Sequence, residues 1–531
     1  MKANPKSRPS LASQIASGAM FTTVATTAKL ISGTVLQMIL VRMITVDEFG
    51  LYRLAMESSS FAIMFVTFFV GGNGAASTTR IVSLGLTEGA PDGIRSAVIT
   101  SLFSVVVMSL FLLVSGYFCI PSLLKNVFQV PPDQLPAAIP FFRWFLIYIF
   151  VSGVSTVLSA ALRGCEFFKA FSITESLSNV VRLALIPLLI HFGAGLNGIA
   201  WGFSGAILVG IIPSLWILET FTRTRDSRIA KTQYVADLKA LTGFGIPVFV
   251  STLSSTVYYS ADALILGYYL PVKYVALYGA GIVLVHSLLN LFSGLETALF
   301  PILSSSLHRR EKGQEAVILE KAYRLLIVIA APASVYSFLM TPYMIRFLFG
   351  LDYFEAVAPS RILTVLVLAW ALMPASVMFL STGRPHINAR LGVISALLNI
   401  VLDLVLIPFL GIIGAAISNA CSRLYGELEG VRICARIFGA KFPWLYCAKV
   451  FAISLICFLP VLASLWTLDA TVGFFTALII LVLTAAAYGV ILGFVLFLSS
   501  LLSAEDKRIM ADLLERTPLR IVNRVFRLRE R

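Results

Sequence analysis

Charged residues are scarce in this chain. Asp, Glu, Lys and Arg make up 13% of its 531 residues, whereas about 25% is usual in soluble domains. Hydrophobic residues reach 58%, and the mean hydropathy is +0.91. Too few polar side chains are available to cover the surface of a water-soluble globule, so that class is excluded and a polytopic membrane protein is indicated.

Two common kinds of site are also missing from the sequence. No G-x-x-x-x-G-K-[ST] phosphate loop is present, which excludes ATP-driven export by this chain alone. The six cysteines show no C-x-x-C spacing, so we expect free thiols rather than a metal site, and no cofactor.

Long apolar runs fill most of the chain instead. A membrane-crossing helix needs about 20 predominantly apolar residues, and about fourteen runs meet that need. The sequence therefore predicts an all-α membrane protein with spans at 14–41, 55–78, 96–120, 138–162, 171–192, 196–219, 243–268, 275–303, 323–349, 359–381, 388–410, 412–434, 444–467 and 471–501.

The formal net charge of +14 raises the question of a nucleic-acid partner. With the N-terminus in the cytoplasm, the cytoplasmic loops and tails would hold 32 of the 41 Lys and Arg residues, and the opposite side only seven. This asymmetry is the positive-inside rule of membrane proteins. It predicts that both termini are cytoplasmic and removes the argument for nucleic acid.

The two ends of the chain carry further expectations. The first apolar run is too long for a signal peptide and lacks an A-x-A cleavage site, so a retained span is expected. Over residues 503–531, arginines recur at helical spacing beside an apolar stripe. That pattern is typical of an amphipathic helix lying on the anionic cytoplasmic leaflet, and a solvated helix is the alternative.

The sequence also contains an internal repeat. Residues 43–55 match residues 269–281, with Tyr52 falling on Tyr278. A second match joins 161–202 to 379–420 and pairs Gly164 with Gly383, Asn179 with Asn399, Pro187 with Pro408, and Gly198 with Gly414. Two copies of a six-helix unit are therefore predicted, and they share one orientation because six is even. In transporters, such repeats form two lobes that rock against each other and give alternating access.

The predicted organisation follows from the repeat. It comprises a cytoplasmic tail at 1–13, an N-lobe at 14–219, a basic cytoplasmic linker at 220–242, a C-lobe at 243–434, two extra helices within 444–501, and a basic cytoplasmic tail at 503–531.

Four stretches carry a family resemblance. They are ITVDEFGLYRLA at 44–55, the start of the second half at 241–281, ALFPILSSS at 298–306, and STGRP at 381–385. With the fourteen predicted spans, the chain resembles the polysaccharide-transporter branch of the multidrug/oligosaccharidyl-lipid/polysaccharide exporter superfamily, the Wzx-type flippases.

The resemblance implies a function in the plasma (inner) membrane. Such a protein would flip undecaprenyl-pyrophosphate-linked oligosaccharide from the inner to the outer leaflet, for lipopolysaccharide or exopolysaccharide synthesis. The implied partners are the lipid-linked oligosaccharide, membrane lipids and other polysaccharide-assembly proteins. A peptidoglycan-precursor flippase or a drug exporter of the same superfamily is the alternative.

Two basic residues fall inside the predicted spans of the N-lobe, Lys29 in the first and Arg182 in the fifth. A charge inside a membrane costs about 2.5 to 3.5 kcal/mol, so each is a candidate for a function. Arginine can hold phosphate oxygens bidentately and lysine acts as a point charge, which makes both candidates for binding pyrophosphate. The alternative is ion pairing with Glu57 or Glu175.

Acidic residues and one histidine occupy the predicted spans of the C-lobe. A membrane carboxylate can bind H⁺ or Na⁺ and couple its gradient to lobe movement, and a histidine can relay protons. Hydrogen bonding or ion pairing without transport is the alternative at every position. The candidates are Asp262, His286, Glu296 and Asp403.

The adjacent carboxylates Asp47 and Glu48 raise an enzyme alternative, a membrane glycosyltransferase or polymerase. Such enzymes often carry an acidic pair in the first external loop, where these residues would lie. In the repeat, however, the pair corresponds to Lys273 and Tyr274, which is not expected of catalytic acids. The pair is therefore interpreted as part of a turn, and the chain as a transporter rather than an enzyme.

Overall fold

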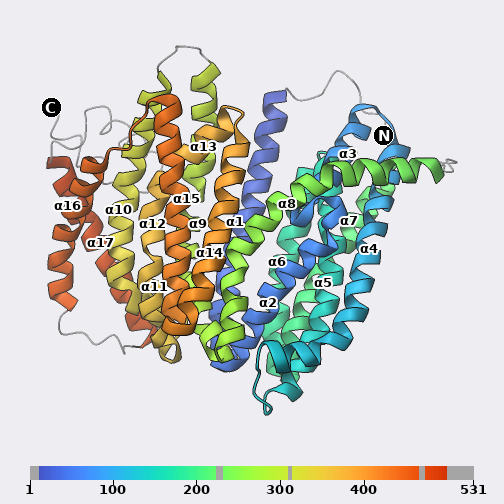
Figure 1. Ribbon diagram of the computed structural model, residues 1–531, viewed down its shortest axis with the longest axis horizontal. Coiled ribbons are helices and arrows are strands. Elements are labelled where there is room, and N and C mark those ends of the chain that lie inside the picture. Colours follow the sequence, from blue (N-terminus) through green and yellow to red (C-terminus); the bar gives the residue numbers. More distant parts are fainter. Residues whose placement is uncertain (1–10, 223–230, 309–313, 466–472, 499–531) are drawn as a thin grey trace. The chain divides into compact units, whose positions relative to one another are not determined.

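The computed structural model of the protein describes residues 11–222, 231–308, 314–465 and 473–498. Side chains are described there except at 11–20, 22–24, 73, 231, 251, 254, 255, 258, 259, 291, 293–308, 314, 497 and 498. Most of the predicted N-terminal tail, residues 223–230 of the linker, and the predicted amphipathic tail at 503–531 lie outside the described residues. Within the described ranges, every regular element is a helix, which confirms the all-α prediction (Figure 1).

The α-helices follow one another along the whole described chain. They are α1 (Leu11–Met43), α2 (Val46–Val66), α3 (Ala76–Thr87), α4 (Pro91–Ser122), α5 (Leu135–Gly164), α6 (Phe168–Leu189), α7 (Gly195–Thr222), α8 (Lys231–Tyr269), α9 (Val272–His308), α10 (Gln314–Leu348), α11 (Val357–Leu363), α12 (Val365–Ala369), α13 (Pro374–Ser381), α14 (Pro385–Leu410), α15 (Ile412–Phe438), α16 (Trp444–Leu465) and α17 (Phe474–Leu498). Shorter turns of 3-10 or π type are η2 (Phe68–Val70), η3 (Gly72–Gly74), η4 (Leu123–Val127), η5 (Ile190–Ala194), η6 (Leu351–Ala356) and η7 (Trp370–Leu372).

Nine segments of the described part are long and apolar enough to cross a membrane. Several other helices carry polar residues that lower their mean hydropathy, as α15 does with Glu427, Glu429 and Arg432. Most of the predicted spans coincide with α-helices, whereas those at 55–78 and 359–381 are each divided among several shorter helices. The number of fourteen crossings stays a prediction.

The chain divides into two compact units. The first contains Met1–Val283 and Gly392–Ser422, and the second contains Leu284–Leu391 and Arg423–Arg531. Helices α9, α14 and α15 therefore contribute to both units. The predicted lobes at 14–219 and 243–434 stay a prediction.

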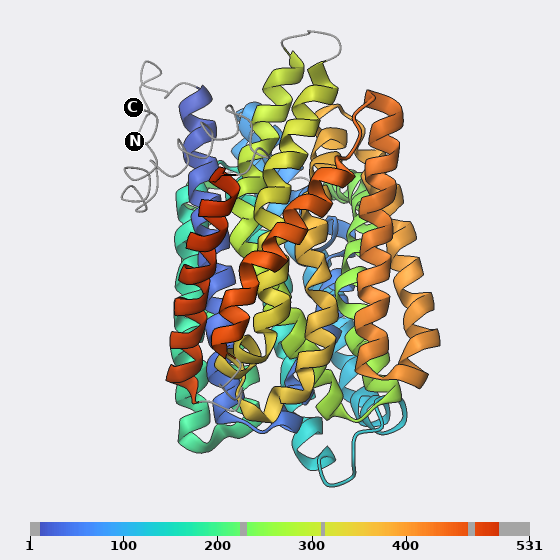
Figure 2. The same ribbon diagram turned by 90° about the vertical axis from the view of Figure 1, so that its left-hand side faces the viewer.

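In the second unit, α16 and α17 pack on α10 (Figure 2). The hydroxyl of Tyr336 on α10 donates to the carbonyl of Leu481 at 2.7 Å, and the hydroxyl of Tyr488 on α17 donates to the carbonyl of Ser454 at 3.2 Å. The two tyrosine rings stack with centroids 5.9 Å apart. Rings with hydrogen-bonded hydroxyls therefore hold the two helices that lie outside the repeat.

In the first unit, the second predicted span is broken. Helix α2 ends at Val66, and η2 and η3 separate it from α3. Gly71, Gly72 and Ala75 adopt φ angles of 94°, 75° and 45°, in the left-handed region that glycine occupies most readily. The regular α-helix is therefore interrupted between Val66 and Ala76, and a neighbouring helix can pack closely at this position.

Helix α8 packs across this break and is strongly bent (Figure 1). Its first half crosses α3 and α4, and its second half runs beside α2. Pro247 lies inside the helix and removes a backbone hydrogen bond, which is a usual cause of kinks. The first turns of α8 occupy part of the predicted linker, where the buried Asp237 accepts a hydrogen bond from Ser96 of α4.

The contact between α8 and the break generates a prediction. A Cβ added at Gly245 would lie 2.5 Å from the backbone oxygen of Phe69, which cannot rotate away. Gly245→Ala is therefore expected to destabilise the protein by about 1 to 3 kcal/mol, measured by thermal unfolding in detergent micelles. Gly33→Ala is the control, because no atom lies within 4 Å of a Cβ at that position. Equal effects of the two substitutions would contradict the close contact.

Candidate functional site

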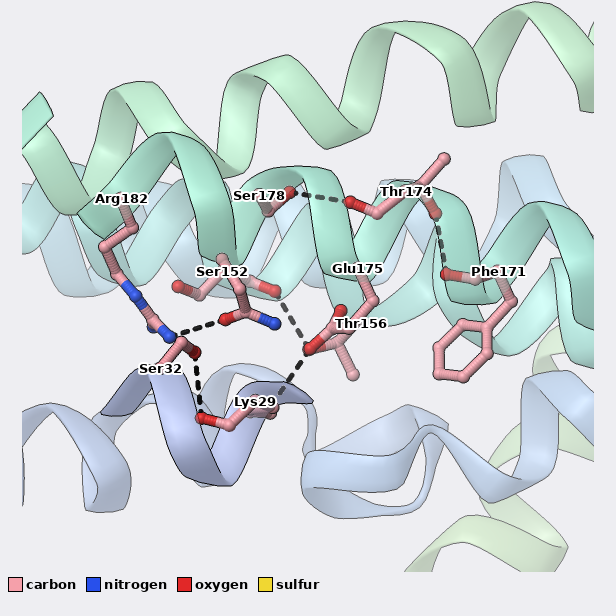
Figure 3. Close-up of polar contacts among 10 residues, drawn as sticks. Lys29, Ser32, Ser152, Thr156, Phe171, Thr174, Glu175, Ser178 and Arg182 are labelled. Atoms are coloured by element: carbon pink, nitrogen blue, oxygen red, sulfur yellow. Dashed lines mark hydrogen bonds and ion pairs between the residues drawn. The ribbon is translucent and has the colours of Figure 1, made fainter. Parts of the chain in front are cut away.

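The two basic candidates lie near each other on α1 and α6 of the first unit (Figure 3). The Nζ atom of Lys29 lies 3.2 Å from Oε1 of Glu175, and the lysine side chain is 59% exposed. Lys29 therefore has an acidic partner, and enough of its side chain is accessible to contact a further group.

Arg182 lies two turns further along α6 (Figure 3). Its Nη2 donates to Oδ1 of Asn179 at 2.5 Å, and its guanidinium lies 5.2 Å from the centroid of the Phe203 ring. No carboxylate in the described part of the chain forms an ion pair with it. The glutamate that the sequence places on its helical face pairs with Lys29 instead.

Three buried polar groups around Arg182 lack a partner among the described residues. They are Nε of Arg182, Nδ2 of Asn179 and the hydroxyl of Ser152. Figure 3 shows Ser152 near Arg182. Each of these groups can donate a hydrogen bond, and buried donors in proteins are almost always paired. An anion with several oxygens would satisfy them. We call Ser152, Asn179 and Arg182 the donor cluster.

Glu57 is held at a different place. Its Oε1 lies 2.6 Å from Nη2 of Arg53, one turn earlier on α2, and its Oε2 accepts a hydrogen bond of 2.7 Å from Ser260 on α8. The two charged side chains are only 12% and 13% exposed. Glu57 therefore forms an ion pair within α2 and a hydrogen bond across to α8.

A second buried cluster joins α8, α9, α14 and α15 within the first unit. Oδ2 of Asp262 accepts hydrogen bonds from the hydroxyl of Tyr278 and, at 2.8 Å, from Nδ2 of Asn419. The carboxyl group of Asp403 lies close enough to Asp262 to interact with it. Asn399, one turn before Asp403 on α14, is fully buried, as Asp403 is. We call Asp262, Tyr278, Asn399, Asp403 and Asn419 the carboxyl cluster.

Five buried oxygen atoms of the carboxyl cluster accept no hydrogen bond of normal geometry in the described part of the chain, although the Ser418 hydroxyl and the Asp262 carboxyl group lie near Asp403. They are Oδ1 of Asp262, both carboxylate oxygens of Asp403, and the amide oxygens of Asn399 and Asn419. Neither aspartate has a basic partner among the described residues. Carboxylate and amide oxygens are the kind of ligand that a hard cation prefers. In the described ranges, no group of three or more His, Cys, Asp and Glu side chains suits a metal ion.

The two clusters fall at corresponding positions of the predicted repeat. Tyr52 corresponds to Tyr278 and Asn179 to Asn399. The offset that joins Gly198 to Gly414 also joins Phe203, which faces Arg182, to Asn419 of the carboxyl cluster. Arg182 itself falls within one residue of Asp403. A basic residue of one predicted copy therefore falls close to an acidic residue of the other.

The remaining acid–base candidates lie on the part of α9 that belongs to the second unit. His286 is half-buried there. The side chain of Glu296 lies outside those that the structure describes.

Sequence reasoning passed over several residues that the structure brings into these clusters. They are neutral or already paired: Arg53, Ser152, Asn179, Ser260, Tyr278, Asn399 and Asn419. One signal was present, because an asparagine repeated inside two equivalent membrane spans is not explained by an apolar pattern.

The acidic pair at the start of α2 caps that helix. The hydroxyl of Thr45 accepts from the backbone N–H of Glu48 at 3.3 Å, and the Glu48 carboxylate accepts from the backbone N–H of Thr45 at 2.8 Å. This reciprocal arrangement is a capping box. Asp47 lies beside it in the first turn, where a negative charge favours the helix dipole. The pair thus starts a helix, as the turn interpretation expects.

Comparison with known proteins agrees with this architecture. Residues 15–307 match the family described as polysaccharide biosynthesis protein. A probable flippase, AglR, from Haloferax volcanii is 27% identical over 369 residues, which cover 64% of this chain and 72% of that protein. A probable lipid II flippase, MurJ, from Helicobacter pylori is 23% identical over 310 residues, which cover 53% of this chain and 66% of that protein.

Solved structures share the fold. An inward closed conformation of the lipid II flippase MurJ has a TM-score of 0.67 at 17% identity and covers 90% of this chain and 100% of that chain. An inward-facing multidrug resistance transporter of the MATE family, in the MOP superfamily, has a TM-score of 0.61 at 16% identity and covers 78% of this chain and 95% of that one. The relatives are flippases and transporters, and the chain is a multi-pass membrane protein of the same fold.

The capping box generates a prediction about the acidic pair. Thr45→Ala removes the hydroxyl that caps α2 and is expected to lower the free energy of unfolding by about 1 kcal/mol, measured by thermal unfolding. Asp47→Asn is the control and is expected to change stability by less. Both variants are expected to retain wild-type transport, because neither carboxylate is catalytic. Loss of transport in Asp47→Asn without loss of stability would contradict the capping role.

Proposed function

Because the chain belongs to the family of polysaccharide biosynthesis proteins, in the flippase branch of the multidrug/oligosaccharidyl-lipid/polysaccharide exporter superfamily, we propose that it moves a lipid-linked oligosaccharide across the plasma membrane. The substrate is an undecaprenyl-pyrophosphate-linked saccharide, passed from the inner to the outer leaflet by alternating access. The protein is a membrane transporter and not an enzyme.

The donor cluster is the observation that carries the proposal. Such a substrate brings an anionic pyrophosphate into the membrane, where few compensating charges are available. Arg182 offers the forked geometry that matches phosphate oxygens, and its buried neighbours offer two further donors without an acceptor. Lys29, which is more exposed, supplies a second positive charge nearby while Glu175 partly balances it.

The carboxyl cluster supplies the driving force in this proposal. A flippase that moves an anion against a gradient needs a coupled ion, and an oxygen-lined site buried in the membrane suits Na⁺. Five unpaired oxygens from Asp262, Asn399, Asp403 and Asn419 match a coordinated Na⁺ better than a single proton, which would satisfy only one pair of oxygens.

A close contact between two hairpins is consistent with alternating access. The two hairpins predicted to lie at the outer surface meet at Gly50, where a side chain would overlap the backbone of Val272. A path open to the outer side needs these hairpins to separate. The contact therefore suits the state in which the outer side is closed.

A peptidoglycan-precursor flippase is the second candidate, because the fold and one relative match lipid II flippases. Both substrates present a pyrophosphate to the donor cluster, so the charges alone do not distinguish them. A drug exporter is the third candidate. It is disfavoured because the unpaired groups beside Arg182 are hydrogen-bond donors, whereas an organic cation would need acceptors there.

Depletion of the protein from its own cells tests the proposal. Lipid-linked oligosaccharide is expected to accumulate on the inner leaflet, measured by extraction and by protection from an external glycan-modifying enzyme. When the depleted cells express the Arg182→Ala variant instead, the lipid-linked oligosaccharide is expected to be flipped about tenfold to a hundredfold more slowly than by the wild type. Hydrogen bonds to a charged group contribute about 1.5 to 3 kcal/mol, which corresponds to that factor.

Two further variants serve as controls for that experiment. Arg182→Lys keeps the charge and is expected to recover part of the activity. Arg143→Ala removes an arginine that stacks on the ring of Tyr117, 3.9 Å from its centroid, and is expected to behave as wild type. Accumulated lipid II would favour the second candidate, and unchanged surface glycan with altered drug resistance would favour the third and refute the proposal.

The cation site predicts Na⁺-dependent stability. In wild-type protein, replacing choline chloride by NaCl is expected to raise the unfolding temperature, because a ligand at ten times its Kd stabilises the folded state by about 1.4 kcal/mol. Asp403→Asn is expected to abolish the Na⁺ response, because it removes a charged ligand. The exposed Asp133→Asn is the control and should keep it. A response to pH alone, without one to Na⁺, would assign the site to H⁺ instead.

A further inference from the structure

Helix α8 has two polar faces with different partners. Ser260 and Asp262 are two positions apart, so they lie about 200° apart around the helix axis. Ser260 donates to Glu57 on α2, whereas Asp262 accepts from Tyr278 on α9 and from Asn419 on α15. A shift or rotation of α8 therefore alters its bond to α2 and its place in the carboxyl cluster together.

Helix α9 makes a second connection between the same groups. Tyr278 donates to Asp262, and the next residue, Gly279, lies against the side chain of Arg53. A Cβ at Gly279 would lie 2.7 Å from Nε of Arg53. The Arg53–Glu57 ion pair is therefore in contact with both helices that bring Asp262 and Tyr278 to the carboxyl cluster.

On its other side, the ion pair reaches the donor cluster. Tyr52 precedes Arg53 in the chain, is 3% exposed, and lies near the charges of Arg53, Glu57 and Arg182. Its ring packs on Phe203 with centroids 6.1 Å apart, and the ring of Phe203 also contacts the guanidinium of Arg182. A continuous series of buried contacts thus joins the donor cluster to the carboxyl cluster within the first unit.

We propose that the Arg53–Glu57 ion pair transmits the state of the carboxyl cluster to the donor cluster, with Ser260 as the positioning residue. This inference rests on the proposed cation and anion sites. A cation that binds among the unpaired oxygens draws Asp262 and Asp403 toward itself and shifts α8. This shift changes the hydrogen bond that Ser260 donates to Glu57. Because coupling between two sites is reciprocal, an anion at Arg182 alters cation affinity by the same factor.

Hydrogen–deuterium exchange of the full chain in lipid nanodiscs tests this path. Exchange is compared in NaCl and in choline chloride over residues 46–57, which contain the ion pair, and over 399–419, which contain part of the carboxyl cluster. In wild-type protein, Na⁺ is expected to slow exchange about fivefold in both segments. In Ser260→Ala, the response at 399–419 is expected to remain and the response at 46–57 to be lost. Ser260→Thr keeps a hydroxyl and is expected to restore the response at 46–57.

Ser59→Ala is the matched control. Ser59 is buried on α2, and among the described residues its hydroxyl donates only to the carbonyl of Ala55 in its own helix, at 2.6 Å. This variant is expected to keep both responses. Loss of the 46–57 response in Ser59→Ala, or its persistence in Ser260→Ala, would overturn the inference and leave the cation site standing. A wild-type protein without a Na⁺ response at 399–419 would overturn the cation site and this inference with it.

Discussion

Incomplete hydrogen bonding of polar groups inside a membrane is the constraint on which this structure depends. Buried donors and acceptors are almost always paired, and charges in a bilayer are costly. Among the described residues, the first unit nevertheless has unpaired donors around Arg182 and unpaired acceptors around Asp403. An anion would accept hydrogen bonds from the unpaired donors, and a cation would be coordinated by the unpaired acceptors, so the two sites suit ligands of opposite charge. A protein that must release its ligands on each cycle benefits from sites that its own side chains leave incomplete.

The predicted repeat accounts for the likeness of the two clusters. In the sequence, a tyrosine follows the first predicted hairpin of each copy, and an asparagine lies in its fifth predicted span. The scaffold therefore directs side chains to equivalent places, and the charge at one position decides which ion can bind. Arg182 with its aromatic neighbour Phe203 makes one copy suited to an anion. Asp403 with Asn419 makes the other suited to a cation.

Close backbone contacts hold α8 in a position from which it contacts both Glu57 on α2 and the carboxyl cluster. The break between α2 and α3 removes regular helix at residues 67–75, and Gly245 lets α8 approach the carbonyl of Phe69. Further along, α8 bonds Glu57 through Ser260 and enters the carboxyl cluster through Asp262. One bent helix therefore belongs to two polar environments, and such packed contacts change between discrete arrangements rather than by gradual deformation.

Local properties of the sequence determined the helical class, the membrane setting and the candidates Lys29, Arg182, Asp262 and Asp403, because apolar run length and charges within such runs need no knowledge of packing. The capping box of Thr45 and Glu48 was equally local, since its residues are three positions apart. Only the tertiary structure decided that Glu175 pairs with Lys29 and not with Arg182, and that Asn419 reaches Asp262 from 157 positions away. Neutral serines and asparagines are ordinary in membrane helices, and which of them face one another depends on how the helices pack, which no local pattern encodes.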